Sequence, residues 1–265
     1  MFSFLPLPFE GLSNTRDLGG FPAADGKSVQ KKRLLRSGAL YTATANDLKI
    51  LENEYRLALI FDFRSPVERK ASPDPAIPGC RLLETDVLSP EATGVTDDGN
   101  GLEELYRRML EDPHFANSYY LPFYKELVGS ELGKTGYASF LRELIRLPKN
   151  RSALWHCAAG KDRTGMGTIL LLLALGTPLE LICEDYLSHN INQKNEIEKQ
   201  VALFYSGSDP MQKNNVRDFF SVFPEFLDSA LEAMAKIAGR PEDFPEKGLG
   251  LTKEEIAALR ENFLV

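Results

Sequence analysis

The chain has 265 residues, of which 43% are hydrophobic, and a formal net charge of −7. This length suits a single domain over 1–265 with one full core. The acidic balance argues against a nucleic-acid-binding protein, which would need clustered positive charge. The three cysteines show no Cys-x-x-Cys spacing, which indicates a reducing compartment. The first ten residues lack a basic n-region and a cleavage site, so we expect a cytoplasmic protein, with signal-less export left open.

The N-terminal region carries the densest positive cluster of the chain: Lys31, Lys32, Arg33 and Arg36. We expect these residues on a solvated strand edge, with a membrane-facing or substrate-steering role as the alternative.

A helix is predicted over 46–54, and the apolar run 57–61 then predicts a buried parallel strand. Asp62 and Arg64 follow this strand. Because ligand crevices form at the carboxyl ends of parallel strands, we expect both side chains to face a crevice, where they brace a neighbouring loop as an ion pair. Arg16 and Asp17 are expected to anchor the N-terminal segment in the same way.

The region 89–130 begins with a stretch rich in Gly, Thr and Asp, and it continues with two helical patterns over 102–111 and 121–128. We expect this region to form an inserted helical lid or a plain surface excursion. Beyond it, the sequence predicts one strand and several helices: a helix over 136–147, a strand over 152–155, and helices from Thr164 and over 178–190, 226–238 and 252–263. The longest apolar run, 169–175, is far shorter than the ~20 residues that a spanning helix needs.

The segment from His156 to Gly165 reads HCAAGKDRTG and lies between the last predicted strand and a predicted helix. Five residues separate Cys157 from Arg163, which is enough for a loop to curl around a tetrahedral anion with its N–H groups pointing inward. Gly160 allows the turn. The following helix adds its N-terminal partial charge, which favours thiolate at Cys157. Arg163 offers a planar fork for two phosphoryl oxygens.

This decapeptide resembles the signature loop of the cysteine-based protein tyrosine phosphatase superfamily, and the Lys161-Asp162 pair resembles its bacterial and fungal branch of tyrosine and lipid phosphatases. Further segments share the resemblance: 14–20, 36–40, 61–68, 174–176, 185–187, 249–252 and 259–260. The ranges 89–117 and 192–216 carry little of it. The resemblance implies an α/β fold like that of dual-specificity phosphatases, with a central, mostly parallel sheet flanked by helices.

The resemblance and the loop chemistry together assign roles to the loop. Cys157 is the expected nucleophile, and the phosphate-binding residues are Ala158, Ala159, Gly160, Lys161 and Thr164, together with Arg163. Lys161 occurs in relatives that accept phosphoinositides, with a solvent-exposed lysine as the alternative. Asp162 is the expected general acid, with helix capping as the alternative and Asp86 as the second candidate. His156 is expected to hold the loop by hydrogen bonding.

These roles predict a phosphatase that hydrolyses phosphotyrosine through a phosphocysteine intermediate, with phosphoserine, phosphothreonine and phosphoinositides as further substrate classes. We expect no cofactor and no metal, since His114, His156 and His189 lack the pairing of a zinc site. The alternatives are a thiol redox enzyme such as an arsenate reductase, which would need Cys80 or Cys183 as a resolving thiol, or a non-catalytic phosphate-binding module.

Overall fold

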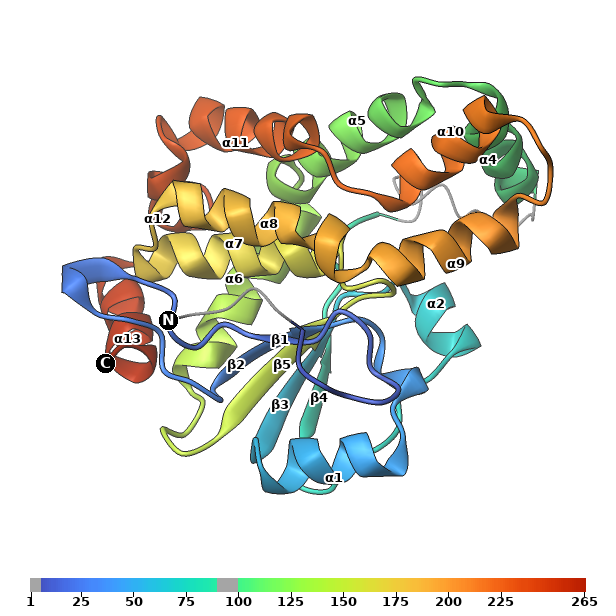
Figure 1. The fold of residues 1–265 in the computed structure, drawn as a ribbon. Helices are drawn as coiled ribbons and strands as arrows, with labels where there is room; N and C mark the ends of the chain where they lie inside the picture. Colours follow the sequence, from blue (N-terminus) through green and yellow to red (C-terminus); the bar gives the residue numbers. More distant parts are fainter. Residues whose placement is uncertain (1–5, 90–99) are drawn as a thin grey trace.

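The computed structural model describes residues 6–89 and 100–265, and within them a five-stranded sheet lies between layers of helices (Figure 1). The strands follow the spatial order β1 (Arg16–Asp17), β2 (Leu34–Ser37), β5 (Ser152–His156), β3 (Leu57–Asp62) and β4 (Arg81–Glu84). Only β1 runs antiparallel to its neighbour, and the other pairs are parallel. The predicted α/β fold with a mostly parallel sheet is confirmed.

The helices of the described residues cover both faces of this sheet, and some form a second layer beyond it (Figure 1). They are α1 (Ala45–Asn53), α2 (Pro66–Ala71), α4 (Asn100–Glu111), α5 (Phe115–Gly129), α6 (Glu131–Ile145), α7 (Asp162–Leu175), α8 (Leu179–Asn192), α9 (Lys194–Phe204), α10 (Pro210–Phe220), α11 (Pro224–Ala238), α12 (Phe244–Lys247) and α13 (Lys253–Phe263). Each predicted helix is present, with ends shifted by a few residues.

Alternating side chains of the central strands supply two separate cores, because successive residues of a strand point to opposite faces. Phe61 and Trp155 belong to the large core that α6 and α7 cover. Ile60 and Leu154 belong to a smaller core that includes Leu51 of α1. β5 is therefore buried on both faces, which fixes the position of the loop that follows it.

The carboxyl ends of three parallel strands meet in one row. In the register of the sheet, His156 is paired with Ser37 on one side and with Asp62 on the other. Asp62 and Cys157 thus leave neighbouring strands at the same edge. The expectation that the Asp62 and Arg64 side chains face a crevice is wrong, because both are buried in an ion pair and neither lines the cavity beside Cys157.

The region expected to form a lid divides between two parts of the molecule. Residues 90–99 lie outside the described residues. α5 packs against α11, and its Tyr124 and Leu127 are fully buried in the large core. α4 instead joins α9 and α10 around a small apolar cluster that includes Met109, Ile197 and Val216. This helical unit, α4 with α9 and α10, lies beside the loop end of the sheet (Figure 1).

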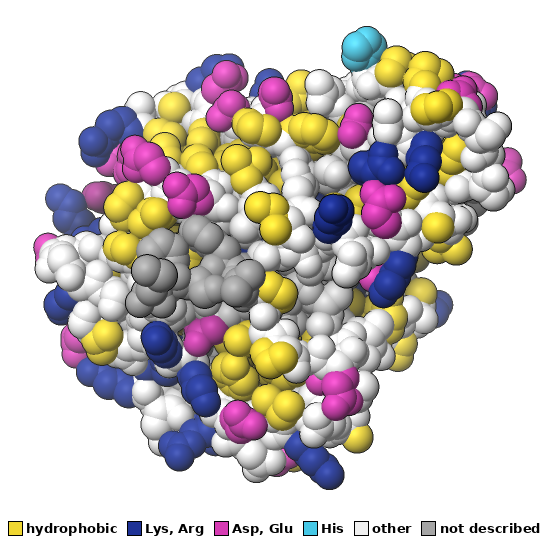
Figure 2. Space-filling view, in the orientation of Figure 1, with side chains coloured by type: hydrophobic (Ala, Val, Ile, Leu, Met, Phe, Trp, Pro, Cys, Tyr) yellow, Lys and Arg dark blue, Asp and Glu magenta, His cyan; other side chains and the backbone are white. Residues whose placement is uncertain are grey.

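The basic cluster of the N-terminal region is not one surface patch. Lys31 and Lys32 are exposed, whereas Arg33 and Arg36 are buried. The expectation of a solvated or membrane-facing cluster is therefore wrong for both arginines, because carbonyl and carboxylate groups inside the fold hold them. On the face that Figure 2 draws, Lys and Arg side chains are interspersed with Asp and Glu. Among the described helices, none combines the length and the apolar character of a membrane span.

Candidate active site

The signature segment forms a tight loop between β5 and α7. Cys157 lies directly after the strand, only 3% exposed, and α7 begins at Asp162. Gly160 adopts a φ of 66°, and a Cβ there would lie 2.5 Å from the Ser37 carbonyl oxygen. Only glycine can make this close turn against β2. The sulfur-bearing residue therefore lies beside the N-terminus of α7, whose partial positive charge attracts anions.

The backbone N–H groups from Ala158 to Thr164 donate no hydrogen bond to any group of the described residues. The carbonyls of the loop, by contrast, face outward and are held. The Asn14 Nδ2 donates to the Gly160 carbonyl at 2.8 Å, and the Arg36 Nη2 donates to it at 2.9 Å. A run of unpaired donors beside a helix N-terminus suits a tetrahedral anion.

Arg163 is held as a fork by Glu68 of α2. Its Nη1 and Nη2 donate to the two carboxylate oxygens at 2.6 and 2.8 Å, and Nη1 also lies 3.3 Å from the Phe63 carbonyl. Burial alone would raise the pKa of Glu68, but the Arg163 contacts outweigh it and lower that pKa to about 2. The carboxylate therefore stays charged, and it fixes the guanidinium plane.

Glu68 reaches Arg163 because α2 begins with a capping box. The Ser65 hydroxyl accepts from the Glu68 N–H, while the Glu68 carboxylate accepts from the Ser65 N–H. Pro66 occupies the first turn, where its missing N–H costs nothing. This cap places the carboxylate at the start of the helix, on the side of the signature loop.

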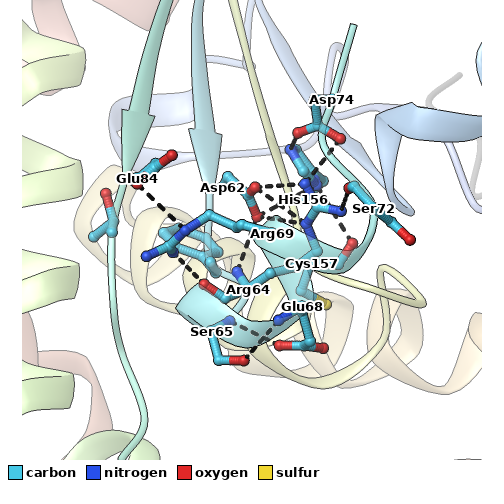
Figure 3. Close-up of polar contacts among 12 residues, drawn as sticks. Asp62, Arg64, Ser65, Glu68, Arg69, Ser72, Asp74, Glu84, His156 and Cys157 are labelled. Carbon is cyan, nitrogen blue, oxygen red and sulfur yellow. Dashed lines mark hydrogen bonds and ion pairs between the residues drawn. The ribbon is translucent and has the colours of Figure 1, made fainter.

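Asp62, Arg64, Asp74 and His156 form a buried polar network behind Cys157 (Figure 3). The expected ion pair is present, with Arg64 Nη2 at 2.6 Å from Asp62 and 2.9 Å from Asp74. His156 Nε2 lies 2.9 Å from Asp74, and its Nδ1 lies 3.3 Å from the Cys157 carbonyl oxygen. The network braces the base of the loop.

The same network brings together three groups that could ligate a metal: Asp62, Asp74 and His156. The Arg64 guanidinium, however, already pairs with both carboxylates. A divalent cation there would lie against a fixed positive charge, so the donor set does not suit a metal.

A second buried ion pair ties the N-terminal segment to α8. Asp185 accepts from Arg36 at 2.7 Å and lies 3.2 Å from Arg16. Arg16 therefore anchors the N-terminal segment through an ion pair, but its partner is Asp185 and not Asp17. Asp17 instead caps a turn by accepting from the N–H groups of Gly19 and Lys32, because its side chain points to the other side of β1.

Lys161 points into the protein. It is 4% exposed, and its Nζ donates to the Tyr120 hydroxyl and to the carbonyls of Phe219 and Ser221 at 3.0 to 3.1 Å. The alternative of a solvent-exposed lysine is wrong, because the end of α10 and the aromatic side chains of α5 enclose the ammonium group. Burial lowers the pKa of Lys161, an effect that Asp162 opposes.

Asp162 lies at the first position of α7 and faces the aromatic core. Its Oδ1 accepts from the Tyr124 hydroxyl at 2.7 Å, and Tyr124 in turn accepts from Tyr186 at 3.0 Å. Burial raises the pKa of Tyr124 well above its ordinary value, so the phenol keeps its proton. Asp86, the second candidate acid, pairs with Arg69 at 2.9 Å.

Thr164 occupies the first turn of α7 and is fully buried. Its hydroxyl has no hydrogen-bond partner among the described residues, although its carbonyl accepts from Trp155 Nε1. The hydroxyl is therefore free to donate to an anion or to the sulfur.

A cavity of about 420 Å³ opens beside the loop. Its lining comes from the loop, the N-terminal segment and the helices α5, α8, α9 and α10: Gly11, Ser13, Ala39, Tyr41, Thr42, Tyr120, Ala158, Ala159, Lys161, Asp162, His189, Gln193, Glu196, Ile197, Gln200 and Phe220. The wall from α9 belongs to the range 192–216, which carries little family resemblance.

The residues that sequence reasoning missed lie far from the loop in the chain, and they contact it directly or through one another: Asn14, Arg36, Glu68, Asp74, Asp185 and His189. For Glu68, the sequence did contain a signal, because Ser65-Pro66 with Glu68 three residues after Ser65 is the pattern of a helix N-terminus. Arg36 and Asp185 also lie in segments with family resemblance, but nothing in either segment indicates that they pair.

The family comparison agrees with this geometry. Residues 7–265 match the model of the tyrosine phosphatase family. A protein of Cupriavidus necator that bears the name "Putative tyrosine-protein phosphatase" is 30% identical over 259 residues, which cover 97% of this chain and 88% of that protein. The match covers nearly the whole length, so every element of the site lies within the matched residues. The chain belongs to the tyrosine phosphatase family.

Proposed function

We propose that this phosphatase hydrolyses phosphotyrosine without a metal, through a phosphocysteine intermediate on Cys157. Phosphoserine, phosphothreonine and phosphoinositides are the further substrate classes that the resemblance implies. The observation that carries the proposal is the combination of a buried cysteine, a run of unpaired N–H groups and a fixed guanidinium fork in one loop.

The donor inventory of Arg163 supports a phosphate beside Cys157. A guanidinium has five N–H donors. Two bind Glu68 and one binds the Phe63 carbonyl, which leaves Nε–H and one Nη2–H on a single edge without a partner among the described residues. That edge matches two phosphoryl oxygens, and Glu68 keeps it in place while charge develops in the transition state.

In the first step, the Cys157 thiolate attacks phosphorus, an S–P bond forms and the P–O bond to tyrosine breaks. Asp162 gives its proton to the leaving phenolate oxygen. In the second step, water attacks the phosphocysteine, Asp162 takes a proton from the water, and the S–P bond breaks to release phosphate and thiolate. Thr164, with its free hydroxyl, would donate to the departing sulfur.

The redox alternative is less well supported for Cys80 as the resolving thiol, because Cys80 lies at the opposite end of the sheet from Cys157. Its thiol donates to the carbonyl of Leu57, which pairs with Ser152 at the start of β5. Cys157 follows the other end of that strand, ~16 Å away at ~3.3 Å per residue. A disulfide needs Cα atoms within ~7 Å.

The test is phosphate release from a phosphotyrosine peptide, with EDTA and reductant present. Cys157→Ser should retain less than about 1% of the turnover and still bind the peptide, because the loop donors remain. Cys80→Ser and Cys183→Ser are the matched controls and should keep their turnover. Residual turnover of several per cent in Cys157→Ser would contradict the phosphocysteine mechanism. Loss of turnover in Cys80→Ser would also contradict it.

A further inference from the structure

The cavity beside the loop has few groups that could bind a second phosphate. Among the described residues that line it, Lys161 is the one Lys or Arg, whereas Asp162 and Glu196 contribute two carboxylates. His189 also lines it, but burial lowers the pKa of this imidazole to about 3, so it carries no charge at neutral pH.

Lys161 has no donor left for a second phosphate. An ammonium group has three N–H donors, and those of Lys161 are directed at the Tyr120 hydroxyl and two backbone carbonyls. A polyphosphorylated headgroup would have to pull this side chain out of all three hydrogen bonds. The remaining positive groups, Arg163 and the loop N–H groups, can bind one phosphate beside the Cys157 sulfur.

The wall of the cavity that α9 provides is acidic and amide-rich. Glu196 lies there with Gln200 and with Gln193, the residue that precedes α9, and its side chain is 40% exposed. Its carboxylate accepts from Lys199 at 3.1 Å and from Gln200 at 3.1 Å. A carboxylate has about four acceptor positions, so Glu196 can still accept from a cation that approaches from the cavity. Lys199 itself is largely exposed and does not line the cavity.

We propose that this cavity selects a singly phosphorylated tyrosine whose neighbouring residues in the substrate chain are Lys or Arg, with Glu196 as the residue that binds the cation. The proposal rests on the proposed function, since it assumes that the phosphate lies at Cys157. It narrows the substrate classes to phosphorylated protein and predicts weaker binding of phosphoinositides. The Glu196 carboxylate would repel an anionic headgroup, whereas it would accept a hydrogen bond from a cationic Lys or Arg side chain.

The experiment measures binding to the Cys157→Ser protein, so that it does not depend on turnover. The probes are two phosphotyrosine peptides that differ only in having Lys or Glu on both sides of the phosphotyrosine, and soluble phosphatidylinositol 3-phosphate and 4-phosphate. We expect the Lys-flanked peptide to bind about tenfold more tightly than the Glu-flanked one and than either lipid. Adding Glu196→Gln should reduce the ratio between the peptides to about twofold.

Glu198→Gln is the matched control, because Glu198 lies on the same helix but pairs with Arg217 and does not line the cavity. It should leave the ratio unchanged. Equal binding of the two peptides, an unchanged ratio in Glu196→Gln, or tighter binding of a phosphoinositide would overturn the proposal. The proposed function fails on a different result, namely the absence of turnover by the wild-type protein on phosphotyrosine.

Discussion

At the scale of single residues, Asp162 is the group whose role is most open to measurement. It lines the cavity beside the loop, and Tyr124 orients its carboxylate. A carboxylic acid can protonate a leaving oxygen only if it faces that oxygen, and a helix cap would face the loop N–H groups instead. The contact with Tyr124, rather than with the backbone, argues against the helix-cap alternative.

Asp162→Asn should therefore affect poor leaving groups most. An alkoxide needs a proton as it departs, so we expect turnover of an alkyl phosphate to fall about 100-fold or more. Nitrophenolate departs without help, and its turnover should fall less than about fivefold. The measurement compares kcat for the two substrates, with Tyr124→Phe as the control that removes only the orienting hydroxyl. Equal losses on both substrates would assign the acid to another residue.

His189 makes the stability of the protein depend on pH. Burial lowers its pKa from 6.5 to about 3, while Lys161 adds to the effect. The unfolded chain binds a proton at this imidazole as the pH falls through 6.5, and the folded chain does not. The contribution of His189 to the free energy of unfolding is therefore fully present above pH 6.5 and is lost as the pH falls toward 3.

Between pH 7 and pH 5 we expect the titration of His189 to lower the free energy of unfolding by about 2 kcal/mol. This follows from 1.36 kcal/mol for each pH unit below 6.5. Urea unfolding at both pH values measures it. His189→Gln, which cannot titrate, should lose most of the difference. The carboxylate of Glu68 contributes only below pH 4.5, so it does not confuse the comparison. A difference of the same size in His189→Gln would show that another group carries the titration.

At the scale of elements, α2 couples a helix cap to the geometry of the phosphate loop. Glu68 is both the N3 residue of the capping box and the partner of Arg163. Glutamine also fits this capping position, so Glu68→Gln keeps the cap and removes the charge. We expect kcat/KM on a phosphotyrosine peptide to fall about 10- to 100-fold, because Arg163 loses the partner that fixes its plane.

Ser65→Ala separates the two roles. It removes the capping hydroxyl and should lower the free energy of unfolding by about 1 kcal/mol, with kcat/KM kept within about twofold. Steady-state kinetics and urea unfolding on both variants check the pair. If Ser65→Ala loses as much activity as Glu68→Gln, the order of the helix start, and not the carboxylate, determines the site.

The sequence predicted those elements whose signals are local. The strand, loop and helix around Cys157 follow one another within 24 residues, 152–175. Thr252 and Glu255 predicted the capping box of α13, and the structure contains it. Contacts between distant residues were not predicted. Arg163 and Glu68 lie 95 positions apart, and Arg36 and Asp185 lie 149 apart. Such pairs depend on strand order and helix packing, which no short pattern encodes.

At the scale of the whole molecule, the phosphate loop is joined to two bodies, the sheet and the helical unit of α4, α9 and α10. The network of Asp62, Arg64 and His156 fixes it to the sheet. Lys161 connects it to the end of α10 through the carbonyls of Phe219 and Ser221. The sequence did not predict this second connection. Residues 192–216, which form α9 and the first part of α10, carry little family resemblance, and Phe219 and Ser221 lie about 60 positions from Lys161 in the chain.

Lys161→Met tests whether that connection holds the helical unit in place. The substitution leaves three acceptors without their donor, at roughly 1 kcal/mol each, partly offset because no cation is buried. We expect the free energy of unfolding to fall by about 2 kcal/mol, and amide exchange to rise at 217–223, where α10 ends. Lys199→Met, on the exposed face of α9, is the control and should change neither. Unchanged exchange at 217–223, together with weaker peptide binding, would instead assign the Lys161 ammonium to the substrate, and the helical unit would then be held by its own apolar cluster alone.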